Sequence, residues 1–320
     1  MKLRFFTLQI TALAALCFGP ASATAALITG IFAFGDSLTD AGNTSLATGG
    51  ALPGAAFYKG RYSNGPVWVE NLAGRLGLSA LTPSLAGGTD NAWAGAYTLT
   101  GGSVPTIAQQ AAGFVAGGGK FLPTDLVVIW GGANDFLLGG QTNPAVPAGN
   151  VAGIISTLAG AGAKTILLPN LPDLGDTPEL LSTGSPGAIL GFSQLSAGFN
   201  LSLYSQIPGL EARLGIDIVE LDIWSIGKGL KKDLSFTNTT QSALLTGNAA
   251  NADQFLYWDT VHPTSRVHDI FGLRAFEALG VPEPGTTVIL LIVGSGLMLR
   301  RRRTGDLLLN SSEPAPAGGC

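Results

Sequence analysis

The chain has 320 residues, of which 46% are hydrophobic and only 12% are charged, so a highly charged disordered chain is excluded. Its 46 glycines and 18 prolines follow no G-X-Y period, which excludes a collagen-like structure. The formal net charge is −4, and residues 27–284 alone carry 11 basic and 19 acidic side chains, a net charge of −8. The sequence therefore has no basic footprint for nucleic acid.

The start of the chain has the organisation of a secretory signal peptide. A short basic region (Lys2 to Arg4) precedes an apolar run from Phe5 to Phe18, and small residues with an A-x-A site follow. We expect residues 1–25 to direct export across the inner membrane and to be cut off after Ala23 or Ala25. The alternative is a buried N-terminal helix.

Between the two ends, short apolar runs alternate with segments of helical periodicity. Strands are predicted at 27–34, 126–130, 164–169 and 216–223. Helices are predicted at 66–73, 151–161, 193–214 with an interruption at Pro208, and 264–279. Stretches rich in glycine, alanine, serine and threonine at 41–56, 84–103, 139–149 and 182–190 are predicted to be loops. Strands separated by helical crossovers indicate one α/β domain, residues 26–280, with a mostly parallel sheet covered by helices.

A second targeting segment, in addition to the signal peptide, is predicted at residues 281–303. Val281-Pro282-Glu283-Pro284 cannot continue the preceding helix, and the apolar stretch that follows, from Gly285 to Leu299, ends at four arginines. Its 15 residues are short against the roughly 20 that cross a bilayer, and the arginines would lie on the cytoplasmic side. This order resembles the PEP-CTERM sorting signal, which implies an exosortase-type processing enzyme and transient anchorage in the inner membrane. A plain tail anchor is the alternative, and the tail 304–320 extends past the point where PEP-CTERM proteins usually stop.

Cysteine usage limits how the mature domain is stabilised. Cys17 and Cys320 are the only two cysteines, and Cys17 lies in the predicted signal peptide. The mature domain therefore has no cysteine pair for a disulfide, and a cysteine-ligated metal site is excluded.

A serine stands where the first predicted strand ends. Ser37 would lie at the carboxyl edge of the sheet, where open α/β folds bind ligands, but its hydroxyl needs a base to become a nucleophile. The chain has two histidines. His262 lies in a predicted loop with Asp259 three residues before it, so the carboxylate can orient the imidazole. His268 lies in the predicted last helix without such a partner, and we interpret it as structural.

Four blocks of sequence follow one another around these residues. They are Gly35-Asp36-Ser37-Leu38 with Asp40 and Asn43, Asn91 to Ala96, Gly132 to Asp135, and Asp259-x-x-His262. In these motifs the sequence resembles the GDSL, or SGNH, family of serine esterases and lipases, over nearly all of residues 27–280. The stretch Arg61 to Trp68 resembles one that is frequent in the lipase-like branch of this family. The resemblance implies a three-layer α/β/α fold with a flavodoxin-like, mostly parallel sheet.

The resemblance also implies a site and a reaction. Ser37 would be the nucleophile, His262 the general base and Asp259 the residue that orients it. The oxyanion hole would consist of the N–H groups of Ser37 and Gly95 and the side-chain amide of Asn134. No metal or organic cofactor is expected. The expected substrate is an ester: a lipid, a small ester or an acylated polysaccharide.

Several of these residues have a second interpretation. Asp36 and Asp40 could form a carboxylate pair for glycosidase or metal chemistry, although aspartates in turns more often accept hydrogen bonds from backbone amides. Asn134 could be only a turn residue, and Gly95 a flexible loop glycine. We interpret Asp135 as structural.

Three functions agree with the sequence. The first is an exported carboxylic-ester hydrolase, the second an acyltransferase that uses the same residues, and the third a non-catalytic surface or matrix-binding protein. All the reactive residues are present, which argues against the third. We expect the predicted loops 41–56, 84–103 and 182–190 to set the depth of the acyl pocket.

Overall fold

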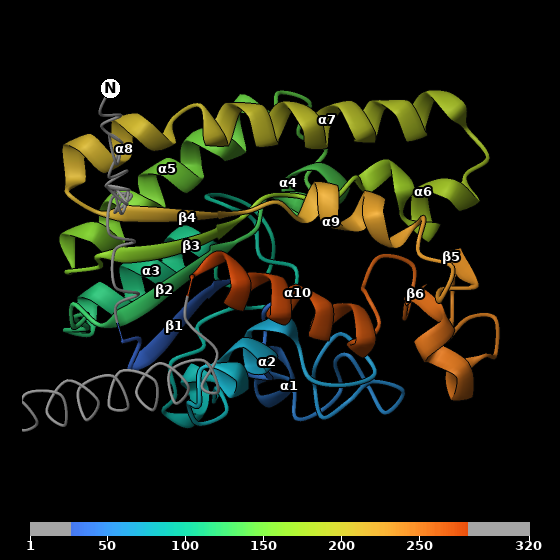
Figure 1. Cartoon of the computed structure of the whole chain (residues 1–320), viewed down its shortest axis with the longest axis horizontal. Coiled ribbons are helices and arrows are strands. Elements are labelled where there is room, and N and C mark those ends of the chain that lie inside the picture. The colour runs from blue at the N-terminus through green and yellow to red at the C-terminus, as the bar shows by residue number, and fades with distance from the viewer. Residues whose placement is uncertain (1–26, 281–320) are drawn as a thin grey trace, which may run out of the picture.

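A parallel sheet of four strands forms the centre of the computed structural model, which describes residues 27–280 (Figure 1). The strands are β1 (Gly30–Gly35), β2 (Asp125–Trp130), β3 (Thr165–Pro169) and β4 (Asp217–Leu221), in the spatial order β1-β2-β3-β4. All neighbouring strands are parallel, and all six residues of β2 are buried, as a strand with helices on both faces requires. The four predicted strands are confirmed.

The segment 89–93 lies along the outer edge of β1 as an irregular fifth strand. The N–H of Ala33 donates to the carbonyl of Thr89 (3.0 Å), and the carbonyl of Ala33 accepts from the N–H of Asn91 (2.7 Å). The chain therefore passes from one side of β1 to the other before it forms β2. In open α/β sheets ligands bind where the strand order reverses. Here that position is between the carboxyl ends of β1 and β2.

Helices cover both faces of the sheet and complete a three-layer α/β/α fold (Figure 1). On one face lie α3 (Ile107–Ala116), α5 (Ala145–Gly160), α7 (Pro186–Tyr204) and α8 (Ile207–Leu214). On the other lie α2 (Trp68–Arg75), α9 (Ile223–Leu230) and α10 (Ser265–Ala278). Phe34 and Phe199 are fully buried in the first of the two cores, and Trp68 in the second. Burial of large side chains on both faces explains why the sheet carries helices on each side.

The remaining elements are short. They are α1 (Asn43–Ala47), α4 (Ala133–Leu137), α6 (Pro178–Ser182), the 3₁₀ turns η1 (Ser84–Ala86), η2 (Leu174–Asp176) and η3 (Ala249–Gln254), and the strands β5 (Asn238–Ser242) and β6 (Phe255–Tyr257). β5 and β6 form a separate parallel pair that the sequence analysis did not predict. α1 and the first turns of α5 lie in stretches predicted as loops.

Two predictions for the region of α7 and α8 need correction. The predicted loop 182–190 is wrong, because α7 begins at Pro186, where the Ser185 hydroxyl accepts the N–H of Ala188. The predicted long helix is two helices, and Pro208 lies in the first turn of α8 rather than at the break. Proline fits that first turn because the backbone N–H it lacks would have no partner within the helix there.

The predicted signal peptide (1–25), the predicted sorting segment (281–303) and the tail 304–320 fall in residues 1–26 and 281–320, outside the described residues. Among residues 27–280, no helix is long and apolar enough to cross a membrane.

Candidate active site

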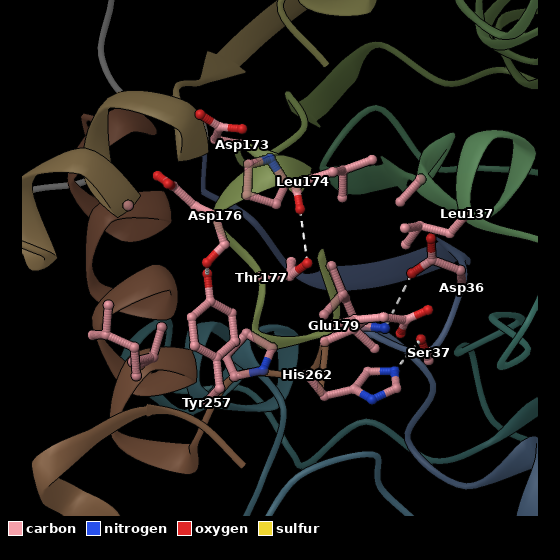
Figure 2. A pocket seen from close by; sticks show the side chains of 18 of the residues that line it. Asp36, Ser37, Leu137, Asp173, Leu174, Asp176, Thr177, Glu179, Tyr257 and His262 are labelled. Carbon is pink, nitrogen blue, oxygen red and sulfur yellow. Dashed lines mark hydrogen bonds between the residues drawn. The ribbon is translucent and has the colours of Figure 1, made fainter. Parts of the chain in front are cut away.

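Ser37 lies on a tight turn directly after β1. Gly35 ends the strand so close to β2 that an added Cβ atom would lie 2.5 Å from the carbonyl oxygen of Trp130, so only glycine fits there. The turn then closes on Asp36, whose carbonyl accepts from the N–H of Thr39 (3.0 Å). This turn places Ser37 in the wall of a cavity at the carboxyl edge of the sheet (Figure 2).

The structure brings Ser37, His262 and Asp259 together from the two ends of the domain. His262 Nε2 lies 2.8 Å from Ser37 Oγ, and Nδ1 lies 2.6 Å from Asp259 Oδ2. Figure 2 shows the Ser37 and His262 side chains directed toward one another. The other oxygen of Asp259 accepts the backbone N–H groups of Val261 (2.9 Å) and His262 (2.7 Å), so the aspartate fixes both the loop and the ring.

The environment of Asp259 favours its charged form. Burial by itself disfavours the carboxylate, but the nearby His262 and the hydrogen bonds from it and from Val261 outweigh burial and lower the pKa of Asp259 below its usual value. An ionised carboxylate beside Nδ1 leaves Nε2 free to accept a proton from the Ser37 hydroxyl.

Tyr62 covers the imidazole, a contact that the sequence analysis did not predict. Its ring centroid lies 5.0 Å from that of His262. Burial, together with the charges of Asp40 and Asp259, raises the pKa of Tyr62, so its hydroxyl stays protonated at neutral pH. Tyr62 belongs to the motif Arg61 to Trp68, which was noted in the sequence without a role for this side chain.

Three candidate oxyanion donors line the same cavity as Ser37. Within residues 27–280, the N–H groups of Ser37 and Gly95 donate to no protein acceptor, and both residues line the cavity. Gly95 has φ +79°, a conformation that favours glycine. Asn134 lies in the first turn of α4, and its side-chain nitrogen donates to the carbonyl of Ala96 (3.1 Å), which leaves its second N–H for a ligand.

His268 lies apart from this group. It is fully buried in α10 between the helix and α2, where Nδ1 accepts the backbone N–H of Trp68 (3.2 Å). Burial lowers the pKa of His268 to about 3, so the ring is neutral at physiological pH. It is not among the residues that line the cavity.

Asp36 and Asp40, near Ser37, accept hydrogen bonds from backbone amides, as the sequence analysis expected for aspartates in a turn. Asp36 accepts the N–H of Leu38 (3.1 Å), and Asp40 accepts the N–H groups of Gly42 (2.8 Å) and Asn43 (2.6 Å). Burial raises the pKa of Asp36 to about 6. Among residues 27–280, no cluster of three or more His, Cys, Asp or Glu side chains is arranged to hold a metal ion.

Asp135 is buried behind Asn134. It accepts hydrogen bonds from the backbone N–H (3.0 Å) and the hydroxyl (2.6 Å) of Thr98. These contacts tie α4 to the segment that follows Gly95, which agrees with a structural role.

The cavity has a volume of about 300 Å³ and runs along the carboxyl edge of the sheet. Each strand of the four-stranded sheet contributes to the cavity wall through residues that follow it. These are Ser37 after β1, Asn134 after β2, residues of the segment 172–179 after β3 and residues between 224 and 231 after β4. Strands that end at one edge deliver side chains to one site, as parallel α/β sheets generally do.

The sequence analysis expected the loops 41–56, 84–103 and 182–190 to shape the pocket, and this prediction is largely wrong. The stretches 41–56 and 182–190 contribute no lining residue, and 84–103 contributes only Ala94 and Gly95. The segment 172–179 and helix α9 supply the wall instead. Neither segment contains a recognisable sequence motif. Only the order of the strands in the sheet could have indicated that these two segments line the cavity.

A serine, an imidazole and a carboxylate in hydrogen-bond contact at this edge of an α/β/α fold define a serine hydrolase. The chain belongs to the family of GDSL-like lipases and acylhydrolases, whose family model matches residues 31–275.

Curated relatives agree with this family. The chain is 29% identical over 297 residues to a phosphatidylcholine-sterol acyltransferase of Aeromonas hydrophila, across 74% of this chain and 86% of that protein. It is 25% identical over 270 residues to a thermolabile hemolysin of Vibrio parahaemolyticus, across 78% of this chain and 63% of that protein. A solved structure of a carbohydrate acetylesterase from Sinorhizobium meliloti is 17% identical with a TM-score of 0.46, across 79% of this chain and 100% of that chain.

Proposed function

We propose that the chain is an exported carboxylic-ester hydrolase in which Ser37, His262 and Asp259 form the catalytic triad. The observation that carries the proposal is the unbroken contact from Asp259 Oδ2 through both ring nitrogens of His262 to Ser37 Oγ. That contact ends inside a cavity large enough for a substrate.

Acylation begins when Ser37 Oγ attacks the ester carbonyl carbon and its proton moves to His262 Nε2. The bond from that carbon to the alcohol oxygen then breaks, and the same Nε2 proton passes to the departing alcohol. Asp259 holds the ring in this tautomer and stabilises the imidazolium. Water repeats the sequence on the acyl-enzyme, with His262 as base and then as acid, and releases the carboxylic acid.

The N–H groups of Ser37 and Gly95 and the amide of Asn134 form the oxyanion hole in this proposal. Negative charge develops on the carbonyl oxygen only as the tetrahedral intermediate forms. Donors fixed in advance around that position lower the barrier without reorganising, and one such donor contributes roughly 10²–10³ in kcat.

Acyl transfer to an alcohol is a second candidate function. The specific observation in its favour is the relative from Aeromonas hydrophila, which is a phosphatidylcholine-sterol acyltransferase. The chemistry differs only in the last step, where an alcohol replaces water. Products measured with and without added alcohol distinguish the two functions.

We also propose that the enzyme works outside the inner membrane, in the periplasm, at the cell surface or in the medium. The predicted signal peptide supports export, and the predicted PEP-CTERM segment supports transient anchorage and processing by an exosortase-type enzyme. The ester substrate would then be a lipid, a small ester or an acylated polysaccharide.

The test is hydrolysis of p-nitrophenyl esters by the wild-type chain and by Ser37→Ala, His262→Ala and the double variant. Each single variant should lose hydrolysis, and the double variant should be no worse, because residues that act as a unit are not additive. A folded Ser37→Ala variant with wild-type activity would contradict the proposal.

A further inference from the structure

The loop between β6 and α10, residues 258–264, carries His262, and the segment 57–65 lies against it. This segment contains part of the motif at Arg61 to Trp68, to which the proposed reaction gives no role. Resting on the proposed ester hydrolysis, we propose that the segment 57–65 clamps the loop. In this clamp Tyr62 is a positioning residue, whose ring holds the imidazole of His262 in the orientation that the reaction needs.

Aromatic rings join the segment to the loop at His262 and before it. The ring centroid of Tyr62 lies 5.0 Å from that of His262, with an angle of 48° between the ring planes. The ring of Phe57 lies 5.9 Å from that of Tyr62 and meets the ring of Trp258 edge-on at 6.3 Å. Trp258 is buried and directly precedes Asp259. The ring that covers the imidazole is therefore held by a side chain that packs on the same loop.

A buried hydrogen bond joins the segment to the backbone directly after His262. The Ser63 hydroxyl donates to the carbonyl of Pro263 (2.9 Å), the residue that follows His262. Ser63 is fully buried, so water cannot replace either partner if the two separate. The bond therefore fixes the distance between the segment and the loop beside the proposed base.

Asn64 extends the contact to the start of α10. The first N–H groups of a helix have no partner within the helix, and the preceding Thr264 does not cap this one, because its hydroxyl donates to the carbonyl of Phe255 (2.9 Å). The side-chain oxygen of Asn64 accepts the N–H of Ser265 instead (2.7 Å). At Gly65 an added Cβ atom would lie 2.5 Å from Cβ of Ser265, so the two backbones are in close contact. These contacts fix the position at which the loop ends.

The clamp acts on the group that must keep two partners at once. His262 Nε2 lies 2.8 Å from Ser37 Oγ, and Nδ1 lies 2.6 Å from Asp259 Oδ2. Rotation of the imidazole about its bond to Cβ would turn both nitrogens away from these partners. The packed ring of Tyr62 opposes that rotation. An aromatic ring at this distance also attracts a positive charge, so the same contact favours the imidazolium that forms in the transition state.

The experiment measures kcat and KM for p-nitrophenyl butyrate with the full chain solubilised in detergent and with its Tyr62 variants. Tyr62→Leu keeps an apolar side chain but removes the ring. We expect kcat to fall by about tenfold with KM within about twofold, since His262 acts as base in both acylation and deacylation. Tyr62→Phe keeps the ring and should restore both constants to within about twofold of wild type.

Tyr58→Leu is the matched control. Tyr58 lies in the same segment and is half-buried like Tyr62, but it is not among the residues that line the cavity. Both constants should stay within about twofold of wild type in this variant. Melting temperatures of all variants show that activity is compared between folded proteins.

Two variants of Asn64 test the clamp at its other end. Asn64→Leu removes the acceptor of the Ser265 N–H, whereas Asn64→Asp keeps an acceptor and adds a negative charge, which is favourable at a helix N-terminus. We expect kcat to fall by about threefold to tenfold in Asn64→Leu, and aspartate to restore it to within about threefold of wild type.

Equal kcat values in Tyr62→Leu and Tyr58→Leu, or a change in KM alone, would overturn the positioning role while the proposed hydrolysis stands. A loss in Tyr62→Phe as large as that in Tyr62→Leu would also overturn it, because the hydroxyl and not the ring would then be responsible. Equal kcat values in the two Asn64 variants would overturn the clamp. A folded wild-type chain that hydrolyses no ester would overturn the proposed hydrolysis as well.

Discussion

The carboxylate of Asp40 accepts the backbone N–H of Ala94 at 3.1 Å, one residue before Gly95. The same buried carboxylate accepts the N–H groups of Gly42, Asn43 and Thr44. One side chain therefore joins the turn that carries Ser37 to the segment that carries a proposed oxyanion donor. We interpret Asp40 as a positioning residue, because it holds backbone N–H groups next to Gly95 and after the Ser37 turn and does not touch the reacting atoms.

Replacing Asp40 tests this coupling. Asp40→Asn exchanges one acceptor oxygen for an NH₂ group, so the N–H of Ala94 loses one of its two acceptors or is repelled, and only the Thr44 hydroxyl (2.9 Å) still accepts it. We expect kcat to fall by roughly tenfold to a hundredfold with KM within about twofold, since a small displacement of a donor acts mainly on the transition state.

Asp125→Asn is the control for this variant. Asp125 is also buried and accepts a backbone N–H, that of Leu122 (2.7 Å), but it lies at the opposite end of the sheet. If both variants lose the same factor in kcat and the same amount of thermal stability, the positioning role of Asp40 is contradicted. Asp40 would then only stabilise the fold.

Asn134→Ala removes a proposed oxyanion donor. We expect kcat to fall by roughly 10²–10³ with little change in KM, because the amide bonds the oxyanion more strongly than the ester carbonyl. Steady-state kinetics on one ester give both constants. Unchanged kcat in a folded variant would contradict the oxyanion role of Asn134. Its side chain would then act only in the turn, through the hydrogen bond to Ala96.

His268 gives a prediction about pH. Its folded-state pKa of about 3 lies below the ordinary value of 6.5, so the unfolded chain binds a proton at this group between those values and the folded chain does not. His268 therefore contributes stability that is present above about pH 6.5 and is lost progressively as the pH falls toward 3.

His268→Gln should flatten that dependence, since glutamine has an oxygen that can accept the N–H of Trp68 but does not titrate. Melting temperatures between pH 7 and pH 4 should fall less steeply in this variant than in wild type, and ester hydrolysis at pH 8 should stay within about threefold. A steeper fall, or loss of hydrolysis in the folded variant, would contradict the structural interpretation of His268.

Deletion of everything after Gly280 tests the proposed sorting segment. The last described helix, α10, ends at Ala278, and Leu279 still packs against the core that α10 helps to form. The truncated chain should be exported, soluble and active. The full chain should fractionate with the membrane until it is processed near Pro282-Glu283-Pro284 in a host with the sorting enzyme. Mass determination of the mature protein checks this, and a mature form that keeps Cys320 would contradict it.

Much of the site could be predicted from the sequence because its parts are local. The turn at Ser37 and the loop from Asp259 to His262 each lie within a few residues, so spacing alone indicated which aspartate could orient which histidine. Contact between these two segments depends on the fold. The parallel sheet, whose strands are short apolar runs, was predicted for the same reason.

The cavity walls could not be predicted in this way. Leu230 and Phe271 have the local pattern of ordinary core residues, and only the order of the strands brings them into one cavity with Ser37. Helix α7 was missed at its start because glycine and serine have low helix propensity, while burial of Phe199 and Leu203 stabilises the helix in the folded chain.

The most direct test of the central claim is reaction with a fluorophosphonate, which phosphonylates a serine oxygen as fluoride leaves. It requires a serine whose proton a base can take, so it reports on the contact between Ser37 and His262 without any assumption about substrate. We expect one phosphonyl group per chain, located on Ser37 by peptide mass spectrometry. It should be absent in Ser37→Ala and form at least about a hundredfold more slowly in His262→Ala. Labelling of a different residue, or equal labelling of Ser37 in wild type and His262→Ala, would contradict it.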